Sequence, residues 1–300
     1  MDGSDPRARR EHPCRGAPVT QDSGPIGVFD SGVGGLTVAA EILRRFPGEQ
    51  ILYLADQAHV PYGGRPLREI QGFAVSISRF LAESGCRALV MACNISSAVA
   101  LERVARDLAP LPVRGMIAAA ARCAAAESAP IGVLATEGTV RSGAYTAQIT
   151  TLNARARVIE IACPRFVPLV QAGELDTPAP REAARERLQH LARAGCRVAI
   201  LGCTHYPFLL PALRRAAADL EMPPVEWLDP ARALVDEMTL TLPGLRACGR
   251  PRVRLLTTGR PDAFAAQAAR FLPGVEAGVE PAAWVSGGRI ETRAPAAACR

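Results

Sequence analysis

The sequence predicts an α/β fold of two pseudosymmetric three-layer α/β domains, whose mainly parallel sheets face each other across an interdomain cleft. Three observations lead to this fold class: short apolar runs alternate with segments of helical periodicity, several of these runs are apolar throughout, and the layout recurs along the chain. Alternating strands and helices are typical of parallel sheets with helices on both faces. The strands of such sheets are continuously apolar, because both of their faces are covered.

The first unit begins with the apolar run 26–29, which ends in Asp30-Ser31-Gly32. Its further predicted elements are, in order, a helix over 36–46, a strand over 51–54, a helix over 70–84, a strand over 88–92 and a helix over 96–109. Gly85 and Pro110 stand directly after the last two helices, where residues that end helices are expected.

The second unit repeats this scheme, with strands predicted over 131–135 and 198–201 and a helix over 181–193 between them. After about Asp229 the pattern continues with one more helix, then a strand and a final helix, predicted over 253–257 and 261–271. We expect this last segment to return to the first domain.

Short matches between the two units indicate a duplication. The tetrapeptide Pro-Ile-Gly-Val occurs at 25–28 and again at 130–133. Further along, Gly-Cys-Arg at 85–87 leads through an apolar run to Cys93, and Gly-Cys-Arg at 195–197 leads through another to Cys203. The spacing from the glycine to the second cysteine is the same in both units, and the matches occur in the same order.

We therefore expect two domains between two tails. Residues 1–24 are polar and rich in turn residues, and they are predicted to be a disordered N-terminal tail. The first α/β domain is predicted to comprise 25–114 plus 229–285, the second 115–228, and a C-terminal tail 286–300.

The composition excludes several kinds of site. All 35 basic residues are arginines, so the chain offers neither a Schiff-base lysine for pyridoxal phosphate nor the lysine of a phosphate-binding P-loop. The nine cysteines are odd in number and form no CxxC pair, and no two histidines are closely spaced. This pattern argues against a disulfide scaffold and against a structural zinc site. We therefore expect no cofactor and no metal.

The partner predicted from the sequence is a small-molecule substrate. The net charge is +6, but the arginines are scattered and no basic run is interleaved with aromatic residues, which argues against nucleic acid. No stretch reaches the roughly 18 apolar residues of a membrane span, and the first residues lack the apolar run of a signal peptide. We expect a cytoplasmic protein, and the sequence leaves open whether it forms a homodimer.

The chemistry is predicted from two cysteines that each follow a strand. Ligands of parallel sheets bind beyond the carboxyl ends of the strands, so Cys93 and Cys203 are expected to meet across the cleft. Inverting an α-carbon requires a base on one face and an acid on the other, and a thiol with a pKa of about 8.5 serves as either near neutrality. The sequence therefore predicts a cofactor-independent amino-acid racemase, an isomerase.

Polar neighbours of the two thiols complete the predicted site. His205 adjoins Cys203 and Asp30 ends the first strand of the other domain, so each is predicted to exchange a proton with its neighbouring thiol. A histidine that only orients the loop, and a turn or helix cap at Asp30, stay open as alternatives. The backbone N–H groups of Asn94 and Thr204 are expected to bind the substrate carboxylate, because they precede a helix or turn.

At these residues the chain resembles glutamate racemase, a member of the cofactor-independent aspartate/glutamate racemase family. The matching segments are GVFDSGVGGL at 27–36, PYG at 61–63, ACN at 92–94, CPRFVPLV at 163–170, LGCTHYP at 201–207 and LTTG at 256–259. Their order and spacing agree over nearly the whole chain outside its two ends. The resemblance implies conversion of L-glutamate to D-glutamate for cell-wall peptidoglycan synthesis, without cofactor or metal.

The resemblance also implies a set of site residues. Catalysis is assigned to Cys93 and Cys203, assisted by Asp30 and His205. The substrate site is assigned to Asp30, Ser31, Tyr62, Gly63, Asn94, Ile95, Thr204 and His205. Spacing alone gives no reason to single out Tyr62 or Gly63, so those two rest on the resemblance.

Three positions depart from the pattern of the family. Ile95 stands where a threonine is usual, so a hydroxyl is lost and only the backbone N–H is left to donate. Gln171 stands where a glutamate is usual, which removes an acidic group beside the second thiol. His59 adds a titratable group ahead of Pro61, and the sequence assigns it no role.

Three other functions are compatible with the sequence. An aspartate or hydantoin racemase would use the same two thiols with a different pocket. A degenerate racemase scaffold acting as a binding protein is suggested by Ile95 and Gln171 and opposed by the intact cysteine pair. A thiol redox role would require the Cα atoms of Cys93 and Cys203 to lie within about 7 Å.

Overall fold

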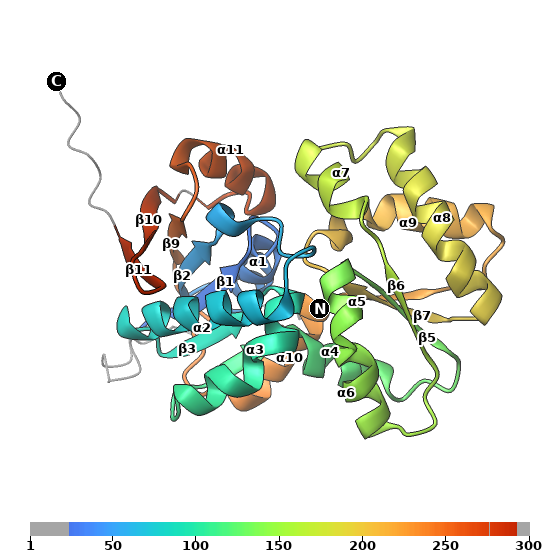
Figure 1. Cartoon of the computed structure of the whole chain (residues 1–300), viewed down its shortest axis with the longest axis horizontal. Coiled ribbons are helices and arrows are strands. Elements are labelled where there is room, and N and C mark those ends of the chain that lie inside the picture. Colours follow the sequence, from blue (N-terminus) through green and yellow to red (C-terminus); the bar gives the residue numbers. More distant parts are fainter. Residues whose placement is uncertain (1–23, 276, 293–300) are drawn as a thin grey trace, which may run out of the picture.

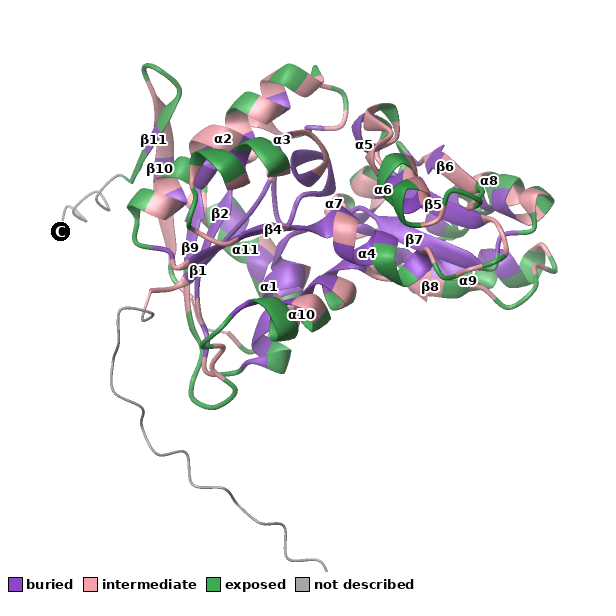
Figure 2. Ribbon diagram, turned by 90° about the horizontal axis from the view of Figure 1, so that it is seen from below, coloured by how far each residue is buried: buried purple, intermediate pink, exposed green. Residues whose placement is uncertain are grey.

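The computed structural model describes residues 24–275 and 277–292 of the 300-residue chain. Its strands form two separate sheets, one in each half of the molecule, with helices on both faces of each sheet (Figure 1). Buried residues concentrate in the strands and on the inner faces of the helices (Figure 2). The predicted fold class, two α/β units with mainly parallel sheets, is confirmed.

The first sheet has seven strands in the order β11-β10-β9-β2-β1-β3-β4. Their bounds are β1 Ile26–Asp30, β2 Gln50–Ala55, β3 Ala88–Met91, β4 Val113–Gly115, β9 Arg252–Thr257, β10 Val279–Val285 and β11 Arg289–Thr292. All neighbouring strands are parallel except β10 and β11. The chain after residue 251 thus returns to the first sheet, as the sequence predicts.

The second sheet has four parallel strands in the order β6-β5-β7-β8. Their bounds are β5 Ile131–Ala135, β6 Val158–Ala162, β7 Val198–Gly202 and β8 Glu226–Leu228. This order repeats β2-β1-β3-β4 of the first sheet. The duplication in the sequence is therefore a duplication of topology.

The pairing register places the two cysteines at equivalent points. Ala88 of β3 pairs with the first residue of the central strand β1, and Val198 of β7 pairs with the first residue of the central strand β5. Cys93 and Cys203 each follow their paired residue by five positions (88 to 93 and 198 to 203). The two cysteines thus lie at equivalent positions beyond the carboxyl ends of the strands in their sheets.

Helices cover both faces of the first sheet. The apolar sides of α1 (Leu36–Arg45), α10 (Pro230–Thr241) and α11 (Pro261–Phe271) share one buried cluster with β1 residues Ile26 and Val28. The apolar sides of α2 (Leu67–Glu83) and α3 (Asn94–Asp107) share another cluster with Phe29 on the opposite face of β1. Neighbouring residues of β1 thus point to opposite layers, as in any pleated strand.

The second sheet is covered in the same way. Its helices α7 (Phe166–Ala172), α8 (Pro178–Ala194) and α9 (Leu210–Asp219) lie against one face. Helices α4 (Met116–Ala124) and α6 (Ala144–Leu152) lie against the other. The shorter elements are α5 (Glu137–Ser142) and the 3₁₀ helices η1 (Gln57–His59) and η2 (Tyr206–Leu209). No helix in the described ranges is long and apolar enough to span a membrane.

The C-terminal prediction requires a correction. Residues 286–300 are predicted to be a tail, but Arg289–Thr292 form β11, an antiparallel partner of β10. Gly287 and Gly288 both have positive φ, at 78° and 70°, and such a pair favours the tight hairpin that joins two strands. The two Gly residues were therefore a strand-pairing signal that the tail prediction overlooked.

Other terminal and boundary predictions are not tested. Residues 1–23 of the predicted N-terminal tail and residues 293–300 lie outside the described part of the chain. The first sheet takes its strands from 26–115 and 252–292, and the second takes its strands from 131–228. The division into domains at 114 and 229 stays a prediction.

Candidate active site

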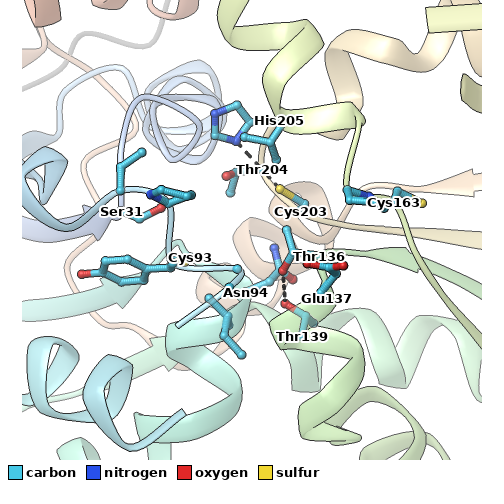
Figure 3. A pocket seen from close by; sticks show the side chains of 18 of the residues that line it. Ser31, Cys93, Asn94, Thr136, Glu137, Thr139, Cys163, Cys203, Thr204 and His205 are labelled. Atoms are coloured by element: carbon cyan, nitrogen blue, oxygen red, sulfur yellow. Dashed lines mark hydrogen bonds between the residues drawn. The ribbon is translucent and has the colours of Figure 1, made fainter. Parts of the chain in front are cut away.

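A cavity of about 370 Å³ lies between the two halves, at the carboxyl ends of their strands. Its size is that of a small-molecule site. Figure 3 shows Ser31, Cys93 and Asn94 on the side of the first half, and Cys203, Thr204 and His205 on the side of the second. All of the predicted site residues line this cavity: Asp30, Ser31, Tyr62, Gly63, Cys93, Asn94, Ile95, Cys203, Thr204 and His205.

Cys93 occupies the N-cap position of α3, two residues after the end of β3. Its side chain is buried, and the thiol is free. Burial, followed by the negative charge of Asp30, raises the pKa of Cys93 to about 12, although the backbone N–H of Ser96 favours the thiolate. The burial of Cys93 thus favours its protonated form in the absence of substrate, and its predicted role as an acid or base stays a prediction.

Cys203 follows β7 and is also a buried free thiol. Burial raises its pKa well above the ordinary value, opposed by the backbone N–H of His205. The Nδ1 atom of His205 lies 3.8 Å from the sulfur of Cys203, and Figure 3 marks this contact. Burial lowers the pKa of His205, partly offset by the charge of Asp30. The imidazole is therefore favoured in its neutral form, in contact with the thiol.

Asp30 joins the two halves at the cavity. Its Oδ2 atom accepts a hydrogen bond of 2.6 Å from the backbone N–H of Gly35 and one of 3.3 Å from the hydroxyl of Thr204. The first bond is the turn-capping role that was left open from the sequence. The second brings Asp30 to the loop that carries Cys203, and the charge of Asp30 also raises the pKa of Cys93. Asp30 thus faces both thiols.

The loop after Asp30 requires a glycine at position 34. A Cβ atom on Gly34 would lie 2.3 Å from the hydroxyl of Thr204 and 2.5 Å from Nδ1 of His205. Such distances are well inside van der Waals contact, so the two loops meet only because position 34 has no side chain. This close approach brings the Asp30 loop of one half against the Cys203 loop of the other.

Tyr62 lies on the wall of the cavity, but its hydroxyl is already used. It donates a hydrogen bond of 2.7 Å to Oδ2 of Asp56, which is fully buried. Asp56 also accepts bonds from Thr258 and Trp284, and it contacts Nδ1 of His59 at 2.8 Å. His59 thus belongs to a cluster that holds the Tyr62 loop and lies outside the cavity lining. The sequence assigned no role to either Asp56 or His59.

Asn94 and Ile95 begin α3 at the floor of the cavity. The Oδ1 atom of Asn94 accepts a hydrogen bond, while its buried Nδ2 atom has no partner among the described residues. The Ile95 side chain is 3% exposed and packs with Tyr62, Ile70 and Cys93. At position 95 the cavity therefore has an apolar wall.

Several lining residues were missed by sequence reasoning. Thr136 and Thr139 share a hydrogen bond of 3.0 Å at the start of α5, and Cys163 directly follows β6. The duplication offered a signal for Thr136, because it follows β5 as Ser31 follows β1. Pro164 and Val167, from the segment 163–170 that carries the resemblance, also line the cavity, as does Gln171, which the sequence singled out as a departure from the family.

Charged groups around the cavity are few. Among the lining residues that the structure describes, none is an arginine. A substrate carboxylate would therefore be held by backbone N–H groups, hydroxyls and the Asn94 amide rather than by a guanidinium. In residues 24–275 and 277–292, no three His, Cys, Asp or Glu side chains gather as a metal ion would require.

Comparison with known proteins fits this arrangement. The model of the family described as Asp/Glu/Hydantoin racemase matches residues 26–238. The chain belongs to this racemase family. The glutamate racemase of Gloeobacter violaceus is 44% identical over 248 residues, which cover 82% of this chain and 92% of that protein.

Solved structures of racemases have the same fold. The glutamate racemase of Thermus thermophilus in complex with β-chloro-D-alanine has a TM-score of 0.78 at 41% identity, covering 87% of this chain and 97% of that chain. The glutamate racemase of Francisella tularensis in complex with D-glutamate has a TM-score of 0.80 at 30% identity, with the same coverages. The two-sheet architecture of this racemase is therefore that of enzymes solved with small amino acids bound.

Proposed function

We propose that this racemase interconverts L-glutamate and D-glutamate, with Cys93 and Cys203 removing and returning the α-proton on opposite faces of the α-carbon. The observation that carries the proposal is the placement of two buried thiols at equivalent points of duplicated sheets, in one cavity. Its relatives support the choice of glutamate as the substrate. The reaction needs no cofactor, because the two thiols supply both the acid and the base.

The raised pKa values of the thiols favour the proton transfer itself. The α-proton of an amino acid is weakly acidic, and a base removes it more readily when the pKa of that base is higher. Burial raises the pKa of Cys93 to about 12, so its thiolate would be a strong base. The cost is that the thiolate must first form in a buried site.

Three features lower that cost. The ammonium group of a bound amino acid places a positive charge in the cavity, which favours a thiolate nearby. On one side, His205 accepts the proton of Cys203 at Nδ1. On the other, Cys93 caps α3, where the helix dipole stabilises a negative sulfur.

The proton balance of the reaction is simple. One thiolate takes the α-proton and becomes a thiol, and the electron pair moves toward the substrate carboxylate. The opposite thiol then gives its proton to the other face of the α-carbon and becomes a thiolate. Asn94 and the backbone N–H groups at the cavity donate to the carboxylate, where the negative charge develops.

The competing functions make different predictions. An aspartate or hydantoin racemase would share the two thiols. No arginine lines the cavity among the described residues, so no guanidinium favours aspartate or hydantoin over glutamate as the substrate. A binding protein without activity is opposed by the placement of His205 against Cys203. A thiol redox enzyme would need to join Cys93 and Cys203, which are free thiols here, in a disulfide.

The test is the product formed from a panel of substrates. The purified enzyme is incubated separately with L-glutamate, L-aspartate and 5-substituted hydantoins, and the enantiomers are resolved by chiral chromatography. We expect D-glutamate and negligible products from the others. If only aspartate or a hydantoin were inverted, that compound would be the substrate instead of glutamate. If none of the compounds were inverted, the binding-protein function would be favoured.

The biological context follows from the product. We propose that the D-glutamate supplies cell-wall peptidoglycan synthesis, so depletion of the enzyme is expected to be rescued by added D-glutamate. A cytoplasmic location stays a prediction, which cell fractionation checks, and light scattering of the purified enzyme decides whether it forms a homodimer.

A further inference from the structure

Tyr145 lies behind the cavity and contacts both cysteine loops. It is the second residue of α6, it is fully buried, and it is absent from the residues that line the cavity. Its hydroxyl donates a hydrogen bond of 2.7 Å to Oδ1 of Asn94, the residue after Cys93. This bond joins the second half of the molecule to the first.

The ring of Tyr145 contacts the other cysteine loop. A Cβ atom on Gly202 would lie 3.1 Å from Cε2 of Tyr145, so the ring packs closely against the residue before Cys203. One side chain therefore touches the neighbour of each thiol, from a helix that carries neither of them.

The hydrogen bond to Tyr145 determines which way the Asn94 amide faces. With Oδ1 occupied by the hydroxyl, the two N–H groups of Nδ2 are buried and have no partner among the described residues, in a residue that lines the cavity. If the amide turned over, Nδ2 could donate to the hydroxyl oxygen of Tyr145, but the hydroxyl proton would lose its acceptor and the cavity would receive a carbonyl oxygen. A buried polar group without its partner is costly, so this bond selects one orientation. That orientation presents donors to a carboxylate.

We propose that Tyr145 is a positioning residue that fixes the Asn94 amide with its N–H groups toward the substrate carboxylate, while its ring sets the spacing of the two cysteine loops. The proposal rests on the proposed function for the identity of the substrate. The hydroxyl bond and the ring contact are properties of the chain itself. Tyr145 acts through Asn94 and does not touch the substrate.

The test removes the hydroxyl and keeps the ring. In Tyr145→Phe, kcat/KM for glutamate is expected to fall about fivefold to tenfold, the size of one lost hydrogen bond. The effect should appear in both directions of the reaction and mainly in KM. In the Asn94→Ala background the same substitution should change nothing further, because the group that it positions is gone.

A matched control comes from the next residue. The hydroxyl of Thr146 donates a hydrogen bond of 2.6 Å to Glu160, and Thr146 is not among the residues that line the cavity. Thr146→Val also removes one hydroxyl from α6, and it should leave kcat/KM unchanged. Melting temperatures of all variants show whether any loss of activity comes from unfolding.

A second measurement does not depend on turnover. Glutarate, a dicarboxylate that cannot be racemised, serves as the probe in calorimetric titration, and its dissociation constant should rise about fivefold in Tyr145→Phe. Wild-type kinetics in that variant, or independent effects of Tyr145→Phe and Asn94→Ala, would overturn the positioning role. Glutarate binding that depends on Tyr145 in a chain that racemises no glutamate would overturn the proposed function instead and keep the positioning role.

Discussion

Cys93 and Cys203 have different neighbours, although their loops are copies of one another. Cys93 lies at the N-terminus of a fourteen-residue helix and close to the charge of Asp30. Cys203 lies before a short 3₁₀ helix and has the imidazole of His205 at 3.8 Å. The duplication thus supplied two equivalent thiols, and each half then provides its own means of forming a thiolate.

The role of His205 predicts a pH dependence. Burial lowers the pKa of His205 below its ordinary value, so the imidazole is neutral near pH 7 and becomes charged only below about pH 6.5. We propose that the neutral form accepts the proton of Cys203, so kcat/KM should fall as the pH drops through this lowered pKa. His205→Gln should reduce kcat about 10²- to 10⁴-fold and abolish this acidic fall. A pH profile of His205→Gln that matches the wild type would show that the histidine only orients the loop.

At the scale of single residues, the sequence predicted those that directly follow strands. Asp30, Cys93 and Cys203 were found because they end apolar runs, and a parallel sheet binds ligands at that edge. Asp56 and Tyr145 were not found, because they act through a hydrogen bond to another residue. Their partners, Tyr62 and Asn94, come close only in the folded chain. No periodicity or spacing in one sequence reports such a contact.

Elements of secondary structure position the site through the loops that follow them. The loop after β1 contacts the loop after β7 across the cleft, and this contact depends on Gly34. The loop between β2 and α2 carries Tyr62 and Gly63 toward α5, where Gly138 lies close to the carbonyl of Gly63. Figure 1 shows that loop extending from the first half toward the second.

The close contact at Gly34 predicts the effect of a single methyl group. In Gly34→Ala the new Cβ atom would collide with Thr204 and His205, so the Cys203 loop must move and kcat should fall by at least about tenfold, the effect of small displacements in catalysis. Gly72→Ala is the matched control, since a Cβ there meets nothing within 4 Å on α2. It should keep wild-type kinetics and gain roughly 0.5–1 kcal/mol of stability in urea unfolding. Equal kinetics in the two variants would contradict the proposed contact.

Long, periodic elements were predicted well, and short ones were not. The helix Pro261–Phe271 was predicted with its observed bounds, and α1 to within one residue. Helices α5 and α7 have six and seven residues, which is too short for helical periodicity to show. Strand β6 is mostly half-buried, so it lacks the continuous apolar run that identified β5 and β7.

The whole molecule places the site where its two copies of one unit meet. Neither sheet alone holds both an acid and a base for the α-carbon. Facing each other, the two carboxyl edges supply one thiol each, and the cavity between them is lined by groups of both halves. The duplication seen in the sequence is therefore sufficient to explain why inversion chemistry arises here.

Burying several thiols also affects the stability of the whole fold. The pKa values of Cys86, Cys93 and Cys163 are raised to about 12 by burial, so the folded state keeps protons that the unfolded state loses above about pH 9. The stability that these thiols contribute is complete below pH 9 and is lost as the pH rises toward 12. The free energy of unfolding in urea, measured under reducing conditions at pH 7.5, 9 and 10.5, should fall over the last interval. Cys86→Ala removes one of these thiols outside the cavity, so the free energy of unfolding should fall less steeply with pH in this variant. The same pH dependence as in the wild type would show that the buried thiols do not cause the fall.

The central claim is that two thiols act on opposite faces of one α-carbon. The most direct test is proton NMR of L-glutamate with the pure enzyme in D₂O, beside Cys93→Ala and Cys203→Ala. We expect the wild type to exchange the α-proton for deuterium and to form D-glutamate, and neither variant to form D-glutamate. D-glutamate formation by either single variant would contradict the two-thiol account, because one remaining thiol would then suffice for inversion.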